Sequence, residues 1–236
     1  MIVAIHQPQY LPWLPYFDKA DQADVFIHLD NVQFMRRGVQ NRNAIKGAQG
    51  ALWLTVPVSA SRDTLICDVR LAENPWRASH IRSIELHYRR APYFALFEEL
   101  RPLLEAPWER LVDLNIAVTE WFFDQLGVRC RRVRASELGA TGMKEDLMIA
   151  LTRAVEGTIY LSGTGAAVYQ QAENFTRVGI ELRYQSYRGQ PYPQLFPEAG
   201  FVPDLSALDL LLNTGPSARE ILLAGRQPAT STVTAS

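Results

Sequence analysis

Two short apolar runs near the N-terminus constrain the fold more than any other feature of this chain. The first is Ile2-Val3-Ala4-Ile5, and the second extends from Val25 to Leu29. Each is rich in β-branched or aromatic residues, as is typical of a buried strand. Between them, Pro12 and Pro15 fit the first turn of a helix that continues to about Ala23, since proline is tolerated at that position and not later. A strand, a helix and a strand in this order predict two parallel strands joined by a right-handed crossover.

The same alternation returns in the second half of the chain, where strand-like and helix-like segments follow one another. A strand-helix-strand-helix-strand order predicts a parallel sheet that is covered by helices. The fold class is therefore predicted to be α/β, with a Rossmann-like, mostly parallel sheet. The expected strands are Leu52–Val58, Ile66–Leu71, Arg129–Arg134, Thr158–Leu161 and Ile180–Tyr187, and the expected helices are Met143–Val155 and a short one from Ala166.

The middle of the chain has a helical period instead. Asn74 can cap a helix, Pro75 can occupy its first position, and apolar residues then recur at helical spacing through Tyr88. Further prolines divide the rest of this region into two more helices, so 74–127 is predicted as a helical insertion or subdomain. Two short helices, Leu205–Leu212 and Ser217–Ala224, precede a tail rich in Thr, Ser and Ala. We expect one α/β domain over 1–226 and a flexible tail over 227–236.

Charge and composition narrow the classes of partner. The formal net charge is −1, so the chain as a whole is not attracted to nucleic acid or to an anionic membrane. Local basic patches remain open at Arg36-Arg37, Arg89-Arg90 and 129–134. The sequence has no apolar stretch of about 20 residues and no signal peptide, so we expect a cytoplasmic protein without membrane insertion.

The cysteines and three of the histidines do not suggest a metal site. Cys67 and Cys130 have no close-spaced partner and are expected to be buried thiols. His80 and His87 are seven residues apart on a predicted helix, about 10 Å from each other, which is too far to chelate one metal ion. His28 alternates along an apolar strand. These three histidines are interpreted as structural, and no metal site is predicted.

The crowded polar turn after the first strand is the first candidate for chemistry. His6 ends the strand, and Gln7 and Tyr10 follow within a few residues. Ligands of open α/β sheets bind beyond the carboxyl ends of the strands. An imidazole at that place can act as a general acid or base, because it carries either protonation state near neutral pH. The alternative is a histidine that caps the following helix or satisfies a buried carbonyl.

The end of the second strand carries a second group of polar residues. Asp30 closes this strand, and at a shared edge of the sheet its carboxylate could orient the imidazole of His6 or hold a substrate amine. Amide and cationic donors suited to a carboxylate or phosphate follow. The alternative is a surface loop with turn-forming asparagines. The predicted substrate-binding residues of this segment are Gln33, Asn41, Arg42 and Lys46.

Two later turns could also bind an anion. Lys144 opens a predicted helix whose free backbone N–H groups favour negative charge, although a plain capped helix start explains the same pattern. Ser162 and Gly163 follow a strand, where small residues let a ligand approach the backbone closely. Neither turn has the spacing of a Walker motif or of a nucleophile elbow. We therefore favour binding over covalent chemistry at Ser162.

Several stretches together carry a family resemblance: His6–Trp13, Lys19–Asp24, Leu29-Asp30, Gln33-Phe34, Asn41–Asn43, Ile45-Lys46, Trp53–Pro57, Tyr160–Gly163 with Tyr169, Tyr192–Gln194, and Leu205–Leu210 with Asn213. In these stretches the chain resembles the WbqC-like family of bacterial proteins, which is often associated with gene clusters for O-antigen and other surface glycans. The resemblance covers nearly the whole chain and implies the modification of an activated or amino sugar. Tyr169 joins the predicted binding residues through this resemblance. Glu145 and Gly189-Gln190 depart from the residues expected in the family, which implies a changed substrate contact at Lys144 and near Pro191.

Three functional hypotheses follow from these residues. The first is a group-transfer enzyme that acts on a small activated metabolite, such as a nucleotide-linked or amino sugar or a natural-product intermediate, in surface-glycan or secondary-metabolite biosynthesis. His6 and Asp30 would be its catalytic residues. The second is an aminoacyl transferase that uses a charged carrier such as aminoacyl-tRNA, whose phosphates the arginines would bind. The third is a non-catalytic module that recognises a glycan intermediate or a partner enzyme. No cofactor is assigned.

Overall fold

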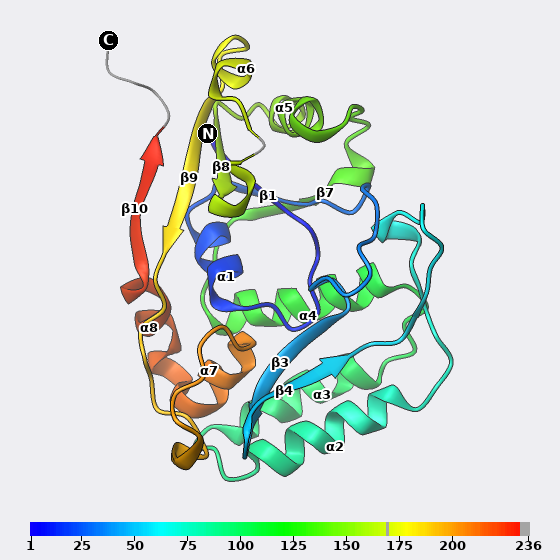
Figure 1. Cartoon of the computed structure of the whole chain (residues 1–236), viewed down its shortest axis with the longest axis vertical. Coiled ribbons are helices and arrows are strands. Elements are labelled where there is room, and N and C mark those ends of the chain that lie inside the picture. Colours follow the sequence, from blue (N-terminus) through cyan, green and yellow to red (C-terminus); the bar gives the residue numbers. More distant parts are fainter. Residues whose placement is uncertain (169, 232–236) are drawn as a thin grey trace.

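A six-stranded sheet runs through the computed structural model, which describes residues 1–168 and 170–231 (Figure 1). The strands lie in the order β10-β9-β8-β1-β2-β7. Five of them are parallel, and only β10 is antiparallel to its neighbour. The α/β class with a mostly parallel sheet is confirmed. The strands are β1 (Ile2–His6), β2 (Val25–His28), β7 (Arg131–Arg134), β8 (Ile159–Gly163), β9 (Glu181–Tyr187) and β10 (Arg226–Ser231).

The strand order changes direction beside β1. From β1 the chain adds β2 and then β7 on one side, and it then crosses to the other side to add β8 and β9. The helices that leave the carboxyl ends of β1 and β8 therefore lie on opposite faces of the sheet. Such a switch point leaves a crevice beyond the strand ends, where α/β proteins bind their ligands. In this fold the switch point lies between β1 and β8.

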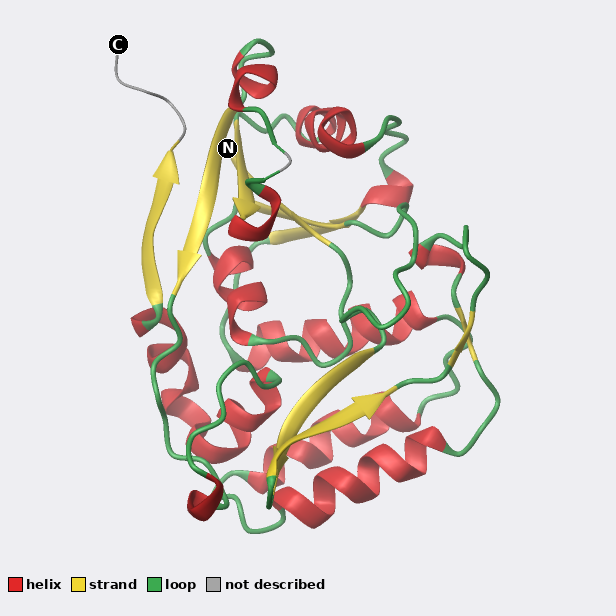
Figure 2. Ribbon diagram, in the orientation of Figure 1, coloured by secondary structure: helices red, strands yellow, loops and turns green. Residues whose placement is uncertain are grey.

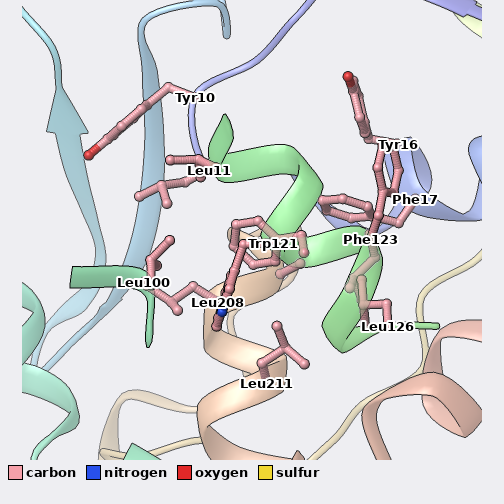
Figure 3. Close-up of a cluster of buried hydrophobic side chains, with 14 of the residues drawn as sticks. Tyr10, Leu11, Tyr16, Phe17, Leu100, Trp121, Phe123, Leu126, Leu208 and Leu211 are labelled. Carbon is pink, nitrogen blue, oxygen red and sulfur yellow. The ribbon is translucent and has the colours of Figure 1, made fainter. Parts of the chain in front are cut away.

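Helices cover both faces of the sheet because its strands are apolar on both sides. Ala4 packs with α1 (Leu14–Asp21) and α4 (Leu111–Gln125), and Val3 packs with α5 (Lys144–Ala154) and α6 (Ala172–Thr176). Figure 1 shows α5 above the sheet and α1 and α4 below it. Figure 3 shows how Phe17 of α1 and Leu211 of α7 (Ala207–Thr214) approach α4 from two sides. We refer to the two sides as the α1/α4 face and the α5/α6 face.

The long connection between β2 and β7 contains two small sheets and three helices. The predicted helices of 74–127 are present, and they share one buried cluster with the central sheet and with α7. In Figure 2 the larger hairpin lies across the helices of this region. Its elements are β3 (Arg42–Gly47), β4 (Gly50–Thr55), β5 (Val58–Ser59), β6 (Arg70–Leu71), α2 (Trp76–Tyr88), α3 (Phe97–Glu105) and α4.

Several local predictions differ from the structure. The expected strand Leu52–Val58 is interrupted at residues 56–57, between β4 and β5. The expected strand 66–71 is a 3-10 turn, Ile66–Asp68, followed by the two-residue β6. The helix expected from Ala166 begins at Ala172 instead, after a 3-10 turn over Thr164–Ala166, because two nearby glycines disfavour a helix nucleus there. The expected flexible tail is partly a strand, because residues 226–231 pair with the free edge of β9, and 232–236 lie outside the described residues.

The C-terminal region completes the α1/α4 face. After α7 the chain forms α8 (Ala218–Ala224), which leads directly into β10. Arg226 at the start of β10 donates hydrogen bonds to Asp18 and Asp21 of α1, at 2.7 and 2.6 Å. The edge strand is thereby tied to the first helix. In the part of the chain that is described, no helix is long and apolar enough to cross a membrane.

Candidate functional site

A row of side chains crosses the sheet at the carboxyl ends of its strands. The register pairs His6 with His28, and His28 with Arg134. On the other side of the switch point it pairs Gly163 with Gln185. Side chains alternate along a strand, so these residues all belong to the α1/α4 face, as Ala4 and Phe26 do. The sheet thus ends in a row of polar residues with one glycine in it.

Gly163 leaves space in this row next to His6. The pairing of β1 with β8 ends at Ala4 and Leu161, and two further residues along each strand bring His6 level with Gly163. A Cβ atom added at Gly163 would have no atom of the described residues within 4 Å, and the same holds for Gly165. The switch point is therefore open on the side of β8.

His6 lies half-buried at this opening with one ring nitrogen in use. Its Nδ1 lies 3.1 Å from the carbonyl oxygen of Gln7, and its ring centroid lies 4.9 Å from that of Tyr16 on α1. A carbonyl can only accept, so Nδ1 carries the proton and Nε2 offers a lone pair. Burial, and then the positive charge of Lys19, hold the pKa of His6 well below its usual value. The imidazole is therefore a neutral proton acceptor.

Lys19 brings a buried amine to the same place. Its side chain is only 3% exposed, and its Nζ donates a hydrogen bond of 3.0 Å to the carbonyl of Ile5. Ile5 is the first residue of β1 beyond the last pair with β8. Burial lowers the pKa of Lys19 to about 7. At neutral pH this amine exchanges readily between its charged and neutral forms.

A second layer of polar groups lies next to His6 on the α1/α4 face. The hydroxyl of Tyr16 lies 3.4 Å from Nδ1 of His28, and Nε2 of His28 lies 4.0 Å from Glu120 of α4. Burial lowers the pKa of His28 to about 4. Burial also raises the pKa of Glu120. His28 is thus a neutral, nearly inaccessible histidine that packs behind the site, as the strand pattern indicated.

The polar turn after β1 is fastened to α4 through amides. Gln40 donates a hydrogen bond of 2.8 Å to the side chain of Gln7, and Asn115 of α4 donates one of 2.7 Å to the backbone of Gln40. Tyr10, expected in the site, is fully buried instead, and its hydroxyl lies 2.9 Å from His80. Gln7 therefore stays beside His6, while Tyr10 belongs to the core.

Asp30 does not meet His6, and this corrects the expectation of a catalytic pair. Its carboxylate is fully buried and accepts hydrogen bonds from Arg134 at 3.0 Å and from Ser136 at 2.8 and 2.7 Å. Arg134 is the last residue of β7 and Ser136 follows it, so Asp30 joins the ends of β2 and β7. The imidazole of His6 is oriented by a backbone carbonyl instead of a carboxylate.

The predicted binding residues after β2 are dispersed. Gln33 is exposed, and its amide donates to the backbone of Arg62. The guanidinium of Arg42 lies over the ring of Trp53, 4.0 Å from its centroid. Lys46 is fully buried and donates to the side chain of Gln194 and to the backbone of Gly200. Of this group, Asn41 alone lines a cavity that we describe.

The predicted residues of the two later turns are also separate from His6. Lys144 is exposed at the start of α5. The neighbouring Glu145 bonds instead to the backbone of Gln171 and the side chain of Asn174. Ser162 is buried and alternates with Gly163, so it lies on the α5/α6 face. Tyr169 lies outside the described residues. Gly163 is the residue of these turns that stands next to His6.

Lys19 and Tyr16 were not among the predicted site residues, although the sequence held a signal for the lysine. Tyr16, Ala20 and Ala23 lie on the buried stripe of the predicted first helix, and Lys19 falls within that stripe. A lysine on an apolar stripe is unusual because its charge must be desolvated. For Gln40 and Asn115 no such signal exists, since their partners depend on the folding of the long connection.

Two cavities lie near the strand ends, and neither is lined by His6. The smaller one, about 80 Å³, lies between Tyr187, Tyr192 and Phe201. The larger one, about 280 Å³, lies next to Asn41. Among the described residues no group of three or more His, Cys, Asp or Glu side chains could hold a metal ion. Cys67 and Cys130 are free and half-buried, and burial raises the pKa of each.

A family model and a curated relative each match most of this chain. The WbqC-like protein family matches residues 7–221. An uncharacterized protein of Mycobacterium tuberculosis, Rv1507c, is 34% identical over 235 residues, which cover 95% of this chain and 99% of the relative. No solved structure gives a significant match.

Proposed function

The chain belongs to the WbqC-like protein family, and we propose that it is a group-transfer enzyme whose reaction takes place at the carboxyl end of β1. The observation that carries this proposal is the state of His6. Its Nδ1 is committed to Gln7, so Nε2 is left as a proton acceptor at the switch point of the sheet. A base held at the usual ligand position of an α/β fold is a catalytic arrangement.

His6 would activate the acceptor of the transferred group. As the acceptor attacks, its hydroxyl or amine proton moves to Nε2 of His6, and its electron pair forms the new bond. The bond to the leaving group breaks and the leaving group departs with that electron pair. The catalytic contribution of such a base is about 10² to 10⁴ in rate.

Lys19 would set the charge of the site. The positive charge of Lys19 lowers the pKa of His6, in addition to the effect of burial. The imidazole therefore stays neutral while the amine is charged. Lys19 thus acts as a positioning residue, and it also holds the strand end through Ile5.

We propose a small activated metabolite as the substrate, in surface-glycan or secondary-metabolite biosynthesis. A nucleotide-linked or amino sugar and a natural-product intermediate are the candidates. The open backbone at Gly163 and Gly165 supports this, because a ligand can approach the main chain closely there. The association of the family with surface glycans supports the sugar.

A thermal-shift screen tests the proposal. Nucleotides, nucleotide-sugars, amino acids and aminoacyl-adenylate analogues are compared with wild type, His6→Asn and His87→Asn. A ligand that binds the folded state raises Tm. We expect one chemical class to stabilise wild type and His87→Asn, with an altered shift in His6→Asn. With that class as substrate, transfer by His6→Asn should be about 100-fold slower or more.

Two results would contradict the proposal. If no class stabilises the wild-type protein, a preformed small-ligand site is wrong. If His6→Asn transfers the group at the wild-type rate, or if a ligand is bound without any transfer to an acceptor, His6 is not a catalytic base. Binding without transfer would favour the non-catalytic module.

The 129–134 cluster gives little support to an aminoacyl-tRNA substrate. Three arginines of the 129–134 cluster already pair with carboxylates: Arg129 with Asp124, Arg132 with Glu120, and Arg134 with Asp30 and Asp113. Neutralised arginines bind phosphates weakly. Binding to tRNA that weakens steeply with salt would restore this hypothesis.

A further inference from the structure

The cavity next to Asn41 lies outside the His6 site and has a distinct chemistry. It has a volume of about 280 Å³ and lies between the segment after β2 and the chain that leaves β4. Phe34, Val56 and Pro57 form an apolar wall, and Arg36 and Arg37 provide charge. Neither Gln7 nor His6 lines it. We call it the arginine groove.

The two arginines of the arginine groove have no acidic partner. No carboxylate of the described residues lies within 4.0 Å of either guanidinium. Arg36 is held in place by a hydrogen bond of 2.7 Å from Nη2 to the backbone of Ala60, which leaves its other N–H groups available. Two adjacent, unneutralised guanidinium groups favour an oxyanion, and two positive charges match a phosphate dianion best.

Asn41 adds a buried hydrogen-bond acceptor to the arginine groove. Its side chain is 8% exposed and is fixed by a hydrogen bond of 2.8 Å from Nδ2 to the carbonyl of Val56. Its Oδ1 is buried, and no described residue donates a hydrogen bond to it. A buried acceptor without a partner costs about 1 to 3 kcal/mol, so a ligand hydroxyl that donates to it would be favoured.

We propose that the arginine groove binds a phosphorylated sugar, with the phosphate on Arg36 and Arg37 and a ring hydroxyl donating to Asn41. The apolar wall would pack against the carbon face of the ring. The volume lies just below the range of about 300 to 1,000 Å³ for drug-sized ligands, which suits a monosaccharide phosphate better than a whole nucleotide. This binding does not depend on His6 as a catalyst.

Calorimetric titration at low ionic strength tests this proposal with defined probes. The probes are glucose 1-phosphate, ribose 5-phosphate, inorganic phosphate, glucose and glucuronate. We expect at least one of the two esters to bind at least tenfold more tightly than inorganic phosphate, and glucose not to bind measurably. The double variant Arg36→Gln/Arg37→Gln should bind the ester at least tenfold more weakly than wild type. The matched control is Arg89→Gln/Arg90→Gln, another exposed adjacent pair, which should leave the affinity unchanged.

The variant Asn41→Leu distinguishes recognition of the sugar from recognition of the phosphate. Loss of the Asn41 amide should weaken binding of the ester and leave the affinity for inorganic phosphate unchanged. If Asn41→Leu does not fold, as judged by its Tm, the comparison of ester with inorganic phosphate in wild type still decides. Equal affinity for ester and inorganic phosphate, preference for glucuronate, or no binding of either ester would overturn the proposal. Equal losses of affinity for the ester in the two double arginine variants would also overturn it. None of these results bears on His6, whose test is the rate of transfer.

Discussion

Lys19 is the residue that departs furthest from ordinary behaviour. A lysine amine almost never lies in a protein interior unless it is paired with an acid, and the one hydrogen bond found for Lys19 goes to a carbonyl. Burial lowers its pKa in the folded protein to about 7, against 10.5 in an exposed lysine. This desolvation lowers the free energy of unfolding, and it does so only at pH values at which the amine of the unfolded chain is charged.

Lys19→Met should change how stability depends on pH. Between about pH 7 and 10 the unfolded wild-type chain binds one proton more at this site than the folded protein, so its free energy of unfolding rises with pH. The variant lacks this contribution. We expect the difference between wild type and variant to change by about 1.4 kcal/mol per pH unit between about pH 8 and 9.5, measured by urea denaturation.

Lys144→Met is the control, because Lys144 is exposed at the start of α5. Its stability curve should run parallel to that of wild type. If the curve of Lys19→Met also runs parallel, the amine of Lys19 is not desolvated in the folded protein.

At the scale of elements, Asp30 holds two strands together. The chain between β2 and β7 is about a hundred residues long, and the register of the two strands depends on contacts at their ends. Asp30 provides three hydrogen bonds at that point, to Arg134 and Ser136. A buried carboxylate with all its partners in place is a structural device, and its removal leaves donors unsatisfied.

Asp30→Asn should destabilise the fold without removing the catalytic base. The new amide N–H groups face donors instead of acceptors, and we expect a loss of about 2 to 4 kcal/mol in the free energy of unfolding, measured by urea denaturation. Asp124→Asn, which breaks an ion pair between exposed side chains, should cause no measurable loss. If Asp30→Asn is as stable as wild type but transfers the group much more slowly, the result would support a catalytic role of Asp30 together with His6.

At the scale of the whole molecule, a buried polar network joins segments that are far apart in the sequence. Asp209 of α7 accepts hydrogen bonds from Tyr88 at 2.7 Å, Tyr192 at 2.8 Å and Gln194 at 2.8 Å. Lys46 of β3 bonds to the other end of Gln194. Burial raises the pKa of Asp209, and these donors oppose the rise. The network holds the irregular segment between β9 and α7 against the hairpin and α2.

Lys46→Met should release that segment. Without the ammonium group, Gln194 loses a donor and the backbone of Gly200 loses its partner. We expect amide hydrogen exchange over 192–202 to accelerate at least tenfold, measured by mass spectrometry, with β1 and β8 unchanged. A uniform acceleration over the whole chain, or none over 192–202, would contradict a local anchoring role.

The class of fold and the location of the site could be predicted because they depend on local patterns. Four consecutive apolar residues predict β1 wherever it packs, and a residue at the end of a parallel strand must lie at the carboxyl edge. His6 and Gly163 were placed at that edge by this argument alone. The helix expected at Ala166 was wrong, and the strand at 226–231 was not predicted, because short elements depend on neighbours: β10 is a strand because β9 offers a free edge.

By itself, the sequence determined the parallel α/β sheet, the edge at which chemistry can occur, and the histidine that stands there. Only the tertiary structure decided the partners of the buried polar groups. In the folded chain Asp30 accepts a hydrogen bond from Arg134, 104 residues away, and Lys46 donates one to Gln194, 148 residues away. Lys19 lies close enough to His6 to lower its pKa. The physical reason is that periodicity reports the face on which a side chain lies, whereas its partner depends on how long connections fold back, which no local pattern records.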